Sequence, residues 1–265
     1  MPTDLKNQIE SNADAVSQFR LIDPPAGFVD DPYPWYAQLR RQSPVHRLSE
    51  RSFFLSRYDD VITAYRDPRT SSDKQAEFTP KFGDSPLLEH HTTSLVFNDP
   101  PLHTRVRRLI MGALNQRAIK QMERGLIQLI DELLNDIEDR NSVDMISDFA
   151  ARIPIEVIGN LLDVPRNERA PLRGWSLAIL SALEPVPHPQ VLQTGNQAVI
   201  DFTDYLRTLV NDRRQSPGDP AVDVLTRLIQ GEKGGEKLTE SELLHNCIFL
   251  LNAGHETTTN LIGNG

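Results

Sequence analysis

Apolar residues return every three or four positions along most of the chain, and this spacing constrains the fold more than any other feature. One stripe runs through Met122, Leu126, Leu129 and Leu133, and residues 191–214 carry a second helical pattern. Positions three and four apart share one face of an α-helix, whereas the strict alternation typical of a strand is rare and short here. The sequence therefore predicts a mainly α-helical fold.

A small β element and several connecting segments are predicted beside these helices. Residues 35–41 are typical of a short helix, and residues 45–48 and 53–55 are strand-like pieces spaced as in a hairpin. Residues 70–94 have little periodicity and include two prolines and a glycine, so we interpret them as a long loop. Residues 231–237 are predicted to form a surface turn.

Charge and cysteine content narrow the class of protein. The 265 residues include 28 Lys or Arg and 37 Asp or Glu, a formal net charge of −9, which disfavours a nucleic-acid partner despite the basic run 105–108. Cys247 is the only cysteine, which excludes an intramolecular disulfide and favours a cytoplasmic location. Residues 1–20 contain no stretch like a signal peptide, and no window reaches the length of a membrane span, so we expect no membrane anchor.

A basic helix is predicted to begin at Asp99, whose side chain can cap it. The apolar residues of this helix then fall on one buried face: Leu102, Val106, Leu109 and Ala113. His103 and Arg107 are four residues apart, so their side chains lie one turn apart and can converge on one anion, such as the carboxylates of a buried cofactor. A solvated basic helix face is the alternative that this segment alone favours.

A second helix is predicted to begin at Thr239, because Thr239 and Glu242 form a capping box. The apolar residues that follow point in nearly every direction around the axis: Leu243, Leu244, Cys247, Ile248, Phe249, Leu250 and Leu251. A helix that is apolar on all sides is surrounded by protein. We therefore expect it in the middle of the fold.

Residues 252–260 of this helix hold a glycine, an acid and three threonines, which helix propensity disfavours. Gly254 costs on the order of 1 kcal/mol relative to alanine, but it lets a small molecule approach the backbone. Thr257 lies one turn after Ala253, so its hydroxyl lies beside the space that the small residues Ala253 and Gly254 leave open. With Glu256 to feed protons inward, the arrangement suits protonation of bound dioxygen. A polar helix end whose threonines bond back to carbonyls is the alternative, and both interpretations stay open.

These segments resemble the cytochrome P-450 superfamily, in its soluble bacterial branch. Residues 253–257, Ala-Gly-His-Glu-Thr, resemble its oxygen-activating helix motif, and residues 103–108, His-Thr-Arg-Val-Arg-Arg, resemble its propionate-binding helix. Residues 57–61 and 66–69 resemble its early strand-to-helix passage. The resemblance implies a mainly α cytochrome P-450 fold with a small N-terminal β element. It also implies one haem-monooxygenase domain over residues 1–265, truncated at its C-terminus.

The resemblance implies haem b as cofactor and monooxygenation as the reaction. One atom of O2 would hydroxylate or epoxidise a small apolar substrate, with electrons from a ferredoxin- or flavodoxin-type partner and its reductase. The site residues that it implies are the propionate-binding His103 and Arg107, the oxygen-site Ala253 and Gly254, and the proton-relay pair Glu256 and Thr257.

The family's thiolate ligand to the iron lies in a glycine-rich loop that is not found before Gly265. Cys247 lies seven residues before Gly254, on roughly the same helix face and about 10 Å along the axis, so it cannot reach the iron from the far side of the porphyrin. We expect Cys247 to be a buried small hydrophobe and the chain to be inactive and marginally stable on its own. An inactive helical fragment or interaction domain of the same fold is the alternative.

A zinc hydrolase is a rival class, since His255 and Glu256 begin like a His-Glu-x-x-His helix. Thr259 stands where the second histidine would be, so no metal-ligand set is predicted. His90 and His91 are interpreted as loop residues without a partner at ligand spacing.

Overall fold

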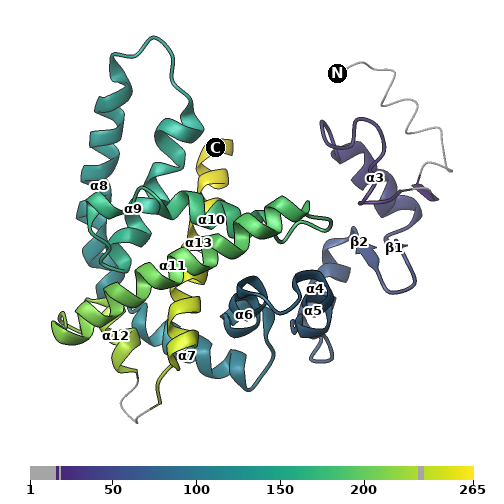
Figure 1. Cartoon of the computed structure of the whole chain (residues 1–265). Helices are drawn as coiled ribbons and strands as arrows, with labels where there is room; N and C mark the ends of the chain where they lie inside the picture. Colours follow the sequence, from purple (N-terminus) through teal and green to yellow (C-terminus); the bar gives the residue numbers. More distant parts are fainter. Residues whose placement is uncertain (1–15, 18, 232–235) are drawn as a thin grey trace. The chain divides into compact units, whose positions relative to one another are not determined.

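The computed structural model describes residues 16–17, 19–231 and 236–265 (Figure 1). The chain divides into two compact units, Met1–Ser71 and Ser72–Gly265. That both belong to one domain stays a prediction. Two predicted segments lie partly outside the described residues. These parts are residues 1–15, where no signal peptide was predicted, and residues 232–235 of the predicted turn.

The first unit contains the predicted helix and hairpin. Helix α3 (Tyr33–Gln42) is followed by strands β1 (Val45–Arg47) and β2 (Phe53–Leu55), which pair antiparallel with Val45 opposite Leu55. Helix α4 (Tyr58–Arg66) follows β2. A small aromatic and aliphatic core joins α3 to β2, whose Phe54 packs against it: Val16, Phe19, Trp35 and Leu39. Both predictions are therefore confirmed.

The second unit is built from helices (Figure 1). Its elements in chain order are α5 (Gln75–Phe82), α6 (Pro86–Thr93), the 3-10 turn η1 (Leu95–Phe97), α7 (Leu102–Ala113), α8 (Gln116–Glu138), the π-helical turn η2 (Met145–Ala150), α9 (Arg152–Leu161), the 3-10 turn η3 (Arg166–Glu168), α10 (Leu172–Ser181), α11 (Pro189–Gln215), α12 (Val224–Gln230) and α13 (Glu240–Asn264). The mainly α fold with one small β element is confirmed. Within the described ranges, no helix is both long and apolar enough to span a bilayer.

Helix α13 is the central element of the second unit, as predicted. It begins with the predicted capping box: the Thr239 hydroxyl accepts a hydrogen bond from the Glu242 N–H at 3.2 Å, and the Glu242 carboxylate accepts one from the Thr239 N–H at 2.8 Å. Helices α6, α9, α10 and α11 and the turn η2 pack around it. Its first turns are buried on every side, and Cys247 is fully buried, which raises the pKa of its thiol to about 12. Cys247 is therefore the buried small hydrophobe that was expected.

The interpretation of residues 70–94 as a loop is wrong, because α5 and α6 lie within this range. Each helix has only eight residues, which is too short for an apolar period to stand out. Proline is nevertheless compatible with α6, because Pro86 occupies its first turn, where no N–H is needed. The Ser85 hydroxyl caps the same end by accepting a hydrogen bond from the Leu88 N–H at 3.3 Å.

His90 and His91 are consequently buried helical residues rather than loop residues. They lie on α6 with the ring centroids 4.9 Å apart, and the His90 ring is 5.5 Å from that of His245 on α13. The His245 Nδ1 is hydrogen-bonded to the Thr93 hydroxyl. Three aromatic rings line the other side of His91: Phe78, Phe82 and Phe97.

Burial keeps all three imidazoles of this cluster neutral. It lowers the pKa of His90 and His245 and brings the pKa of His91 to about 4. The neighbouring imidazoles lower the pKa of His90 further, and Lys81 and His245 do the same for His91. Across the described residues, no group of three or more His, Cys, Asp or Glu side chains is placed to hold a metal ion. The cluster is therefore a packing element that is sensitive to protonation.

We predict that acid weakens the fold through these histidines. The unfolded chain takes up protons near pH 6.5 while the buried rings do not, so the stabilisation is complete above that pH and is lost as the pH falls toward 4. The expected loss for His91 is on the order of 2 kcal/mol by pH 5, measured by urea unfolding at pH 7.5 and 5.0. His91→Phe should remove this part of the pH dependence, whereas the exposed-site control His188→Asn should retain it. An unchanged slope in His91→Phe would contradict the assignment.

Candidate functional site

Helix α7 presents one buried and one polar face, as predicted. Val106, Leu109 and Ala113 are buried. The predicted cap is wrong, however, because the helix begins at Leu102 with Pro101 in the capping position. The Asp99 carboxylate instead accepts a hydrogen bond from the Ser72 N–H at 2.8 Å, so it orders the preceding segment and not the helix end.

His103 and Arg107 lie one turn apart on α7, at the edge of its buried face. The His103 side chain is half-buried and that of Arg107 is exposed. Neither side chain forms a hydrogen bond or ion pair with any other part of the chain that the structure describes. Both are therefore available to bind an anion, and their convergence on one ligand stays a prediction.

The second half of α13 has one open face. Four of its exposed residues recur at the spacing of a single helical stripe: Ala253, Glu256, Thr257 and Asn260. Leu261 extends the stripe with 76% of its surface exposed, and the half-buried Phe249 and Leu250 precede it. An open stripe on an otherwise enclosed helix is a candidate binding surface.

The open face is bordered at its beginning by the segment that leads into α7. Asn246 lies on the same side of α13 as Ala253, two turns earlier. Its side chain accepts a hydrogen bond from the Leu95 N–H at 2.9 Å and donates one to the Thr93 carbonyl at 3.4 Å. Because η1 in turn packs against α7, the two predicted site segments are connected through this border.

An ion pair also ties α7 to the first turn of α13. The Arg105 guanidinium binds the Glu242 carboxylate and donates to the Lys237 carbonyl at 3.3 Å. Burial raises the pKa of Glu242, but hydrogen bonds from Arg105 and the Thr239 N–H, with the Arg105 charge, outweigh this and hold it below its usual value. Ala253 lies eleven residues after Glu242, about 16 Å along the helix axis.

Within residues 253–257, several small or polar groups take part in local packing. The Thr257 hydroxyl donates to the Ala253 carbonyl at 2.7 Å, which is the back-bonding that the alternative interpretation expected. A Cβ on Gly254 would lie 2.6 Å from Ile158 Cδ1, so this glycine makes room for α9. The roles of Ala253, Gly254, Glu256 and Thr257 toward dioxygen stay predictions.

Sequence reasoning missed the polar residues on the buried side of the same helix. Asn252 and His255 are buried, and His255 has both ring nitrogens without a hydrogen-bond partner among the described residues. Burial lowers the pKa of His255, and the positive charge of Arg173 lowers it further. Asn252 and His255 are three residues apart, and the buried Thr259 follows one turn later. This spacing could have indicated a second polar stripe.

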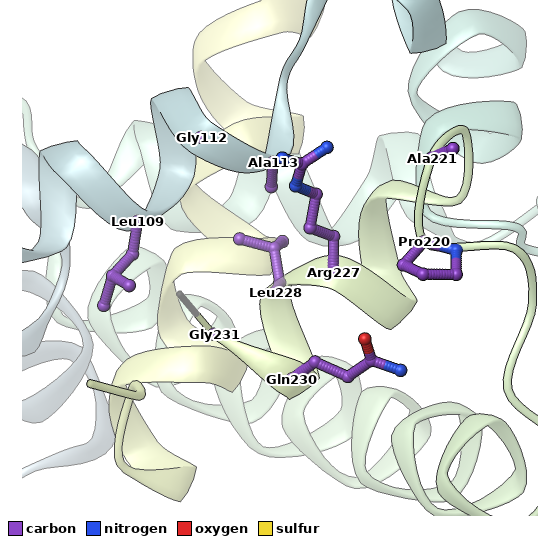
Figure 2. Close-up of a pocket in the computed structure, with 9 residues that line it drawn as sticks. All are labelled: Leu109, Gly112, Ala113, Pro220, Ala221, Arg227, Leu228, Gln230 and Gly231. Carbon is purple, nitrogen blue, oxygen red and sulfur yellow. The ribbon is translucent and has the colours of Figure 1, made fainter. Parts of the chain in front are cut away.

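A cavity of about 450 Å³ lies elsewhere, between the end of α7 and α12. Figure 2 shows the residues that line it: Leu109, Gly112, Ala113, Pro220, Ala221, Arg227, Leu228, Gln230 and Gly231. None of the predicted site residues is among them. The cavity is therefore distinct from the open face of α13.

The sequence profile of the family Cytochrome P450 matches residues 176–264, from the middle of α10 to the end of α13. The chain belongs to the cytochrome P450 family. It is similar to a cytochrome P450 of Bacillus subtilis (33% identity over 244 residues) and to cytochrome P450 107B1 of Saccharopolyspora erythraea (34% over 251). Each alignment covers 89% of this chain and 58% of the relative, so the chain spans little more than half the length of these relatives.

Solved structures show the same fold. P450BioI, in complex with an acyl carrier protein ligated to hexadec-9Z-enoic acid, matches with a TM-score of 0.81 at 28% identity, over 90% of this chain and 61% of that one. Epothilone D-bound P450epoK matches with a TM-score of 0.78 at 29% identity, over 89% and 60%. The mainly α-helical chain, with its small β element, therefore has the cytochrome P450 fold over the part of that fold that it spans.

We predict opposite effects of adding a methyl group at two glycines. Gly125→Ala on α8, where nothing lies within 4 Å of the added Cβ, should raise the free energy of unfolding by about 1 kcal/mol through helix propensity. Gly254→Ala should lower it by about 1 kcal/mol, because Ile158 must move. Adding Ile158→Ala should relieve that contact. Chemical denaturation measures all three, and equal stabilisation by both glycine variants would show that Ile158 is not held against Gly254.

Proposed function

We propose that the protein provides the oxygen-site and propionate-binding parts of a haem-dependent monooxygenase. The reaction is the insertion of one atom of O2 into a small apolar molecule, by hydroxylation or epoxidation. The observation that carries this proposal is the open stripe of α13, which runs past Ala253 and Thr257 on the central helix of a cytochrome P450 fold.

The residues present fit a haem. His103 and Arg107 would hold its two propionates, because both side chains reach solvent and neither is engaged by another described residue. Ala253 leaves only a methyl group on the open face, so a planar ring can approach the backbone there, whereas Ile158 takes the space beside Gly254. When bound, haem supplies the redox chemistry that activates dioxygen.

Glu256 and Thr257 flank Ala253 and serve proton delivery in this proposal. At 3.6 residues per turn they point about 60° and 40° to either side of it. The Thr257 hydroxyl donates to the Ala253 carbonyl, which leaves its oxygen free to accept a proton donor from the open side. The exposed Glu256 can exchange protons with water and pass them to this hydroxyl.

The substrate class follows from the apolar residues along the same stripe. Phe249, Leu250 and Leu261 would contact an apolar molecule that lies beside the oxygen site. The reaction also needs two electrons from outside, for which we propose a ferredoxin- or flavodoxin-type partner with its reductase. Neither a nucleic acid nor a membrane is a proposed partner, and a cytoplasmic location stays a prediction.

We predict that the protein binds haemin through α7. Titration followed by the Soret absorbance should saturate, and His103→Ala and Arg107→Ala should each weaken the affinity roughly tenfold through loss of a charge-assisted contact. The control Arg117→Ala removes an exposed arginine at the start of α8 and should change nothing. Absence of saturable binding by the unmodified protein would contradict the proposed function.

We also predict that Cys247 does not ligate the iron. Its buried thiol has a pKa of about 12 and stays protonated, whereas only a thiolate is a good ligand. Cys247→Ala should therefore leave the spectrum of the reduced, carbon-monoxide-bound haem complex unchanged. Loss of a red-shifted band in this variant would assign the ligand to Cys247 and overturn the prediction.

A further inference from the structure

Helix α7 carries cationic side chains on two opposite sides. Arg105 lies midway in sequence between His103 and Arg107, but at 3.6 residues per turn it points about 160° away from each of them. His103 and Arg107 have no polar partner among the described residues, whereas Arg105 binds Glu242 and the Lys237 carbonyl. Rotation of α7 about its axis would therefore break the Arg105 contacts and turn the other two side chains away together.

Glu242 uses its two carboxylate oxygens for two different purposes. Oε2 accepts the Thr239 N–H at 2.8 Å and completes the capping box, while Oε1 binds the Arg105 guanidinium. The carboxylate is 7% exposed and the Arg105 side chain 27%, so water screens this pair only weakly. One buried carboxylate thus contacts both the start of the central helix and a side chain of α7.

A second ion pair in the same turn provides a contrast. Glu240 binds Arg214 of α11, and these side chains are 44% and 42% exposed. Exposed pairs contribute little, whereas loss of one partner from a buried pair leaves an uncompensated charge. Of the two pairs in this turn, only Arg105–Glu242 is enclosed enough to hold a helix in one orientation.

We propose that Glu242 is a positioning residue, which through Arg105 holds α7 in the rotation that directs His103 and Arg107 toward their anionic ligand. The inference rests on the proposed haem-binding role of α7. A binding site needs its contact residues held within about 0.5 Å. Arg108 of α7 also pairs with Glu236 just before α13, but these side chains are 51% and 40% exposed, so Arg105–Glu242 is the more enclosed of the two pairs.

Haemin titration of matched variants tests this inference. Glu242→Gln keeps the capping box, in which glutamine serves as well as glutamate, but loses the ion pair; it should weaken haemin affinity roughly tenfold. Thr239→Ala removes the cap and keeps the pair, and Glu240→Gln breaks the exposed pair. Both controls should retain the affinity of the unmodified protein, even where Thr239→Ala lowers thermal stability.

A double-mutant cycle separates positioning from general loss of stability. In a His103→Ala/Arg107→Ala background, Glu242→Gln should weaken haemin affinity by less than about threefold, because both groups that it orients are already gone. Amide hydrogen exchange of α7 should rise in Glu242→Gln and not in Glu240→Gln. An additive cycle, with the same tenfold loss in both backgrounds, would overturn the positioning role.

The outcomes distinguish the two proposals. If the unmodified protein binds no haemin, the proposed function fails. If it binds haemin and Glu242→Gln binds equally well, only the positioning role fails. If Glu242→Gln does not fold, Arg105→Lys tests the inference, because lysine keeps the charge but cannot form both contacts of the guanidinium. A haemin affinity at least about threefold weaker supports the inference, and an unchanged affinity overturns it.

Discussion

The second unit depends on the complete burial of the first half of α13. Its apolar side chains point in nearly every direction, and each gains free energy by leaving water, so helices must pack on all sides. Four helices and the turn η2 do so. The capping box stabilises the start of this helix, because it gives otherwise unpaired backbone N–H groups a partner. Helices α6, α9, α10 and α11 are therefore arranged around this one.

The same helix changes character along its length, and this change creates the candidate site. After Asn252 the residues become small and polar, and one stripe is left open to solvent. Gly254 and Thr257 also serve the fold, since one accommodates Ile158 and the other bonds back to the Ala253 carbonyl. Packing and the proposed oxygen chemistry are compatible, because Ile158 approaches Gly254 while Ala253 and Thr257 remain exposed.

Elements whose signals are local were predicted well. The hairpin, α3, α11 and the capping box of α13 all follow from patterns within a few residues. The helices α5 and α6 were missed, because eight residues with a proline carry too little periodicity. The cap at Asp99 was wrong because a distant backbone group, the Ser72 N–H, binds its carboxylate. Local patterns give no indication of such competition.

The sequence by itself determined the helical class, the start of α13 at its capping box and the two motifs that indicate the family. Spacing placed His103 and Arg107 one turn apart and put Thr257 beside Ala253, since these relations are properties of any α-helix. Only the tertiary structure decided which faces are covered. His245 meets Thr93 across 152 positions of sequence, and Arg105 meets Glu242 across 137. Burial, pKa shifts and helix orientation depend on such distant partners, and no local pattern specifies them.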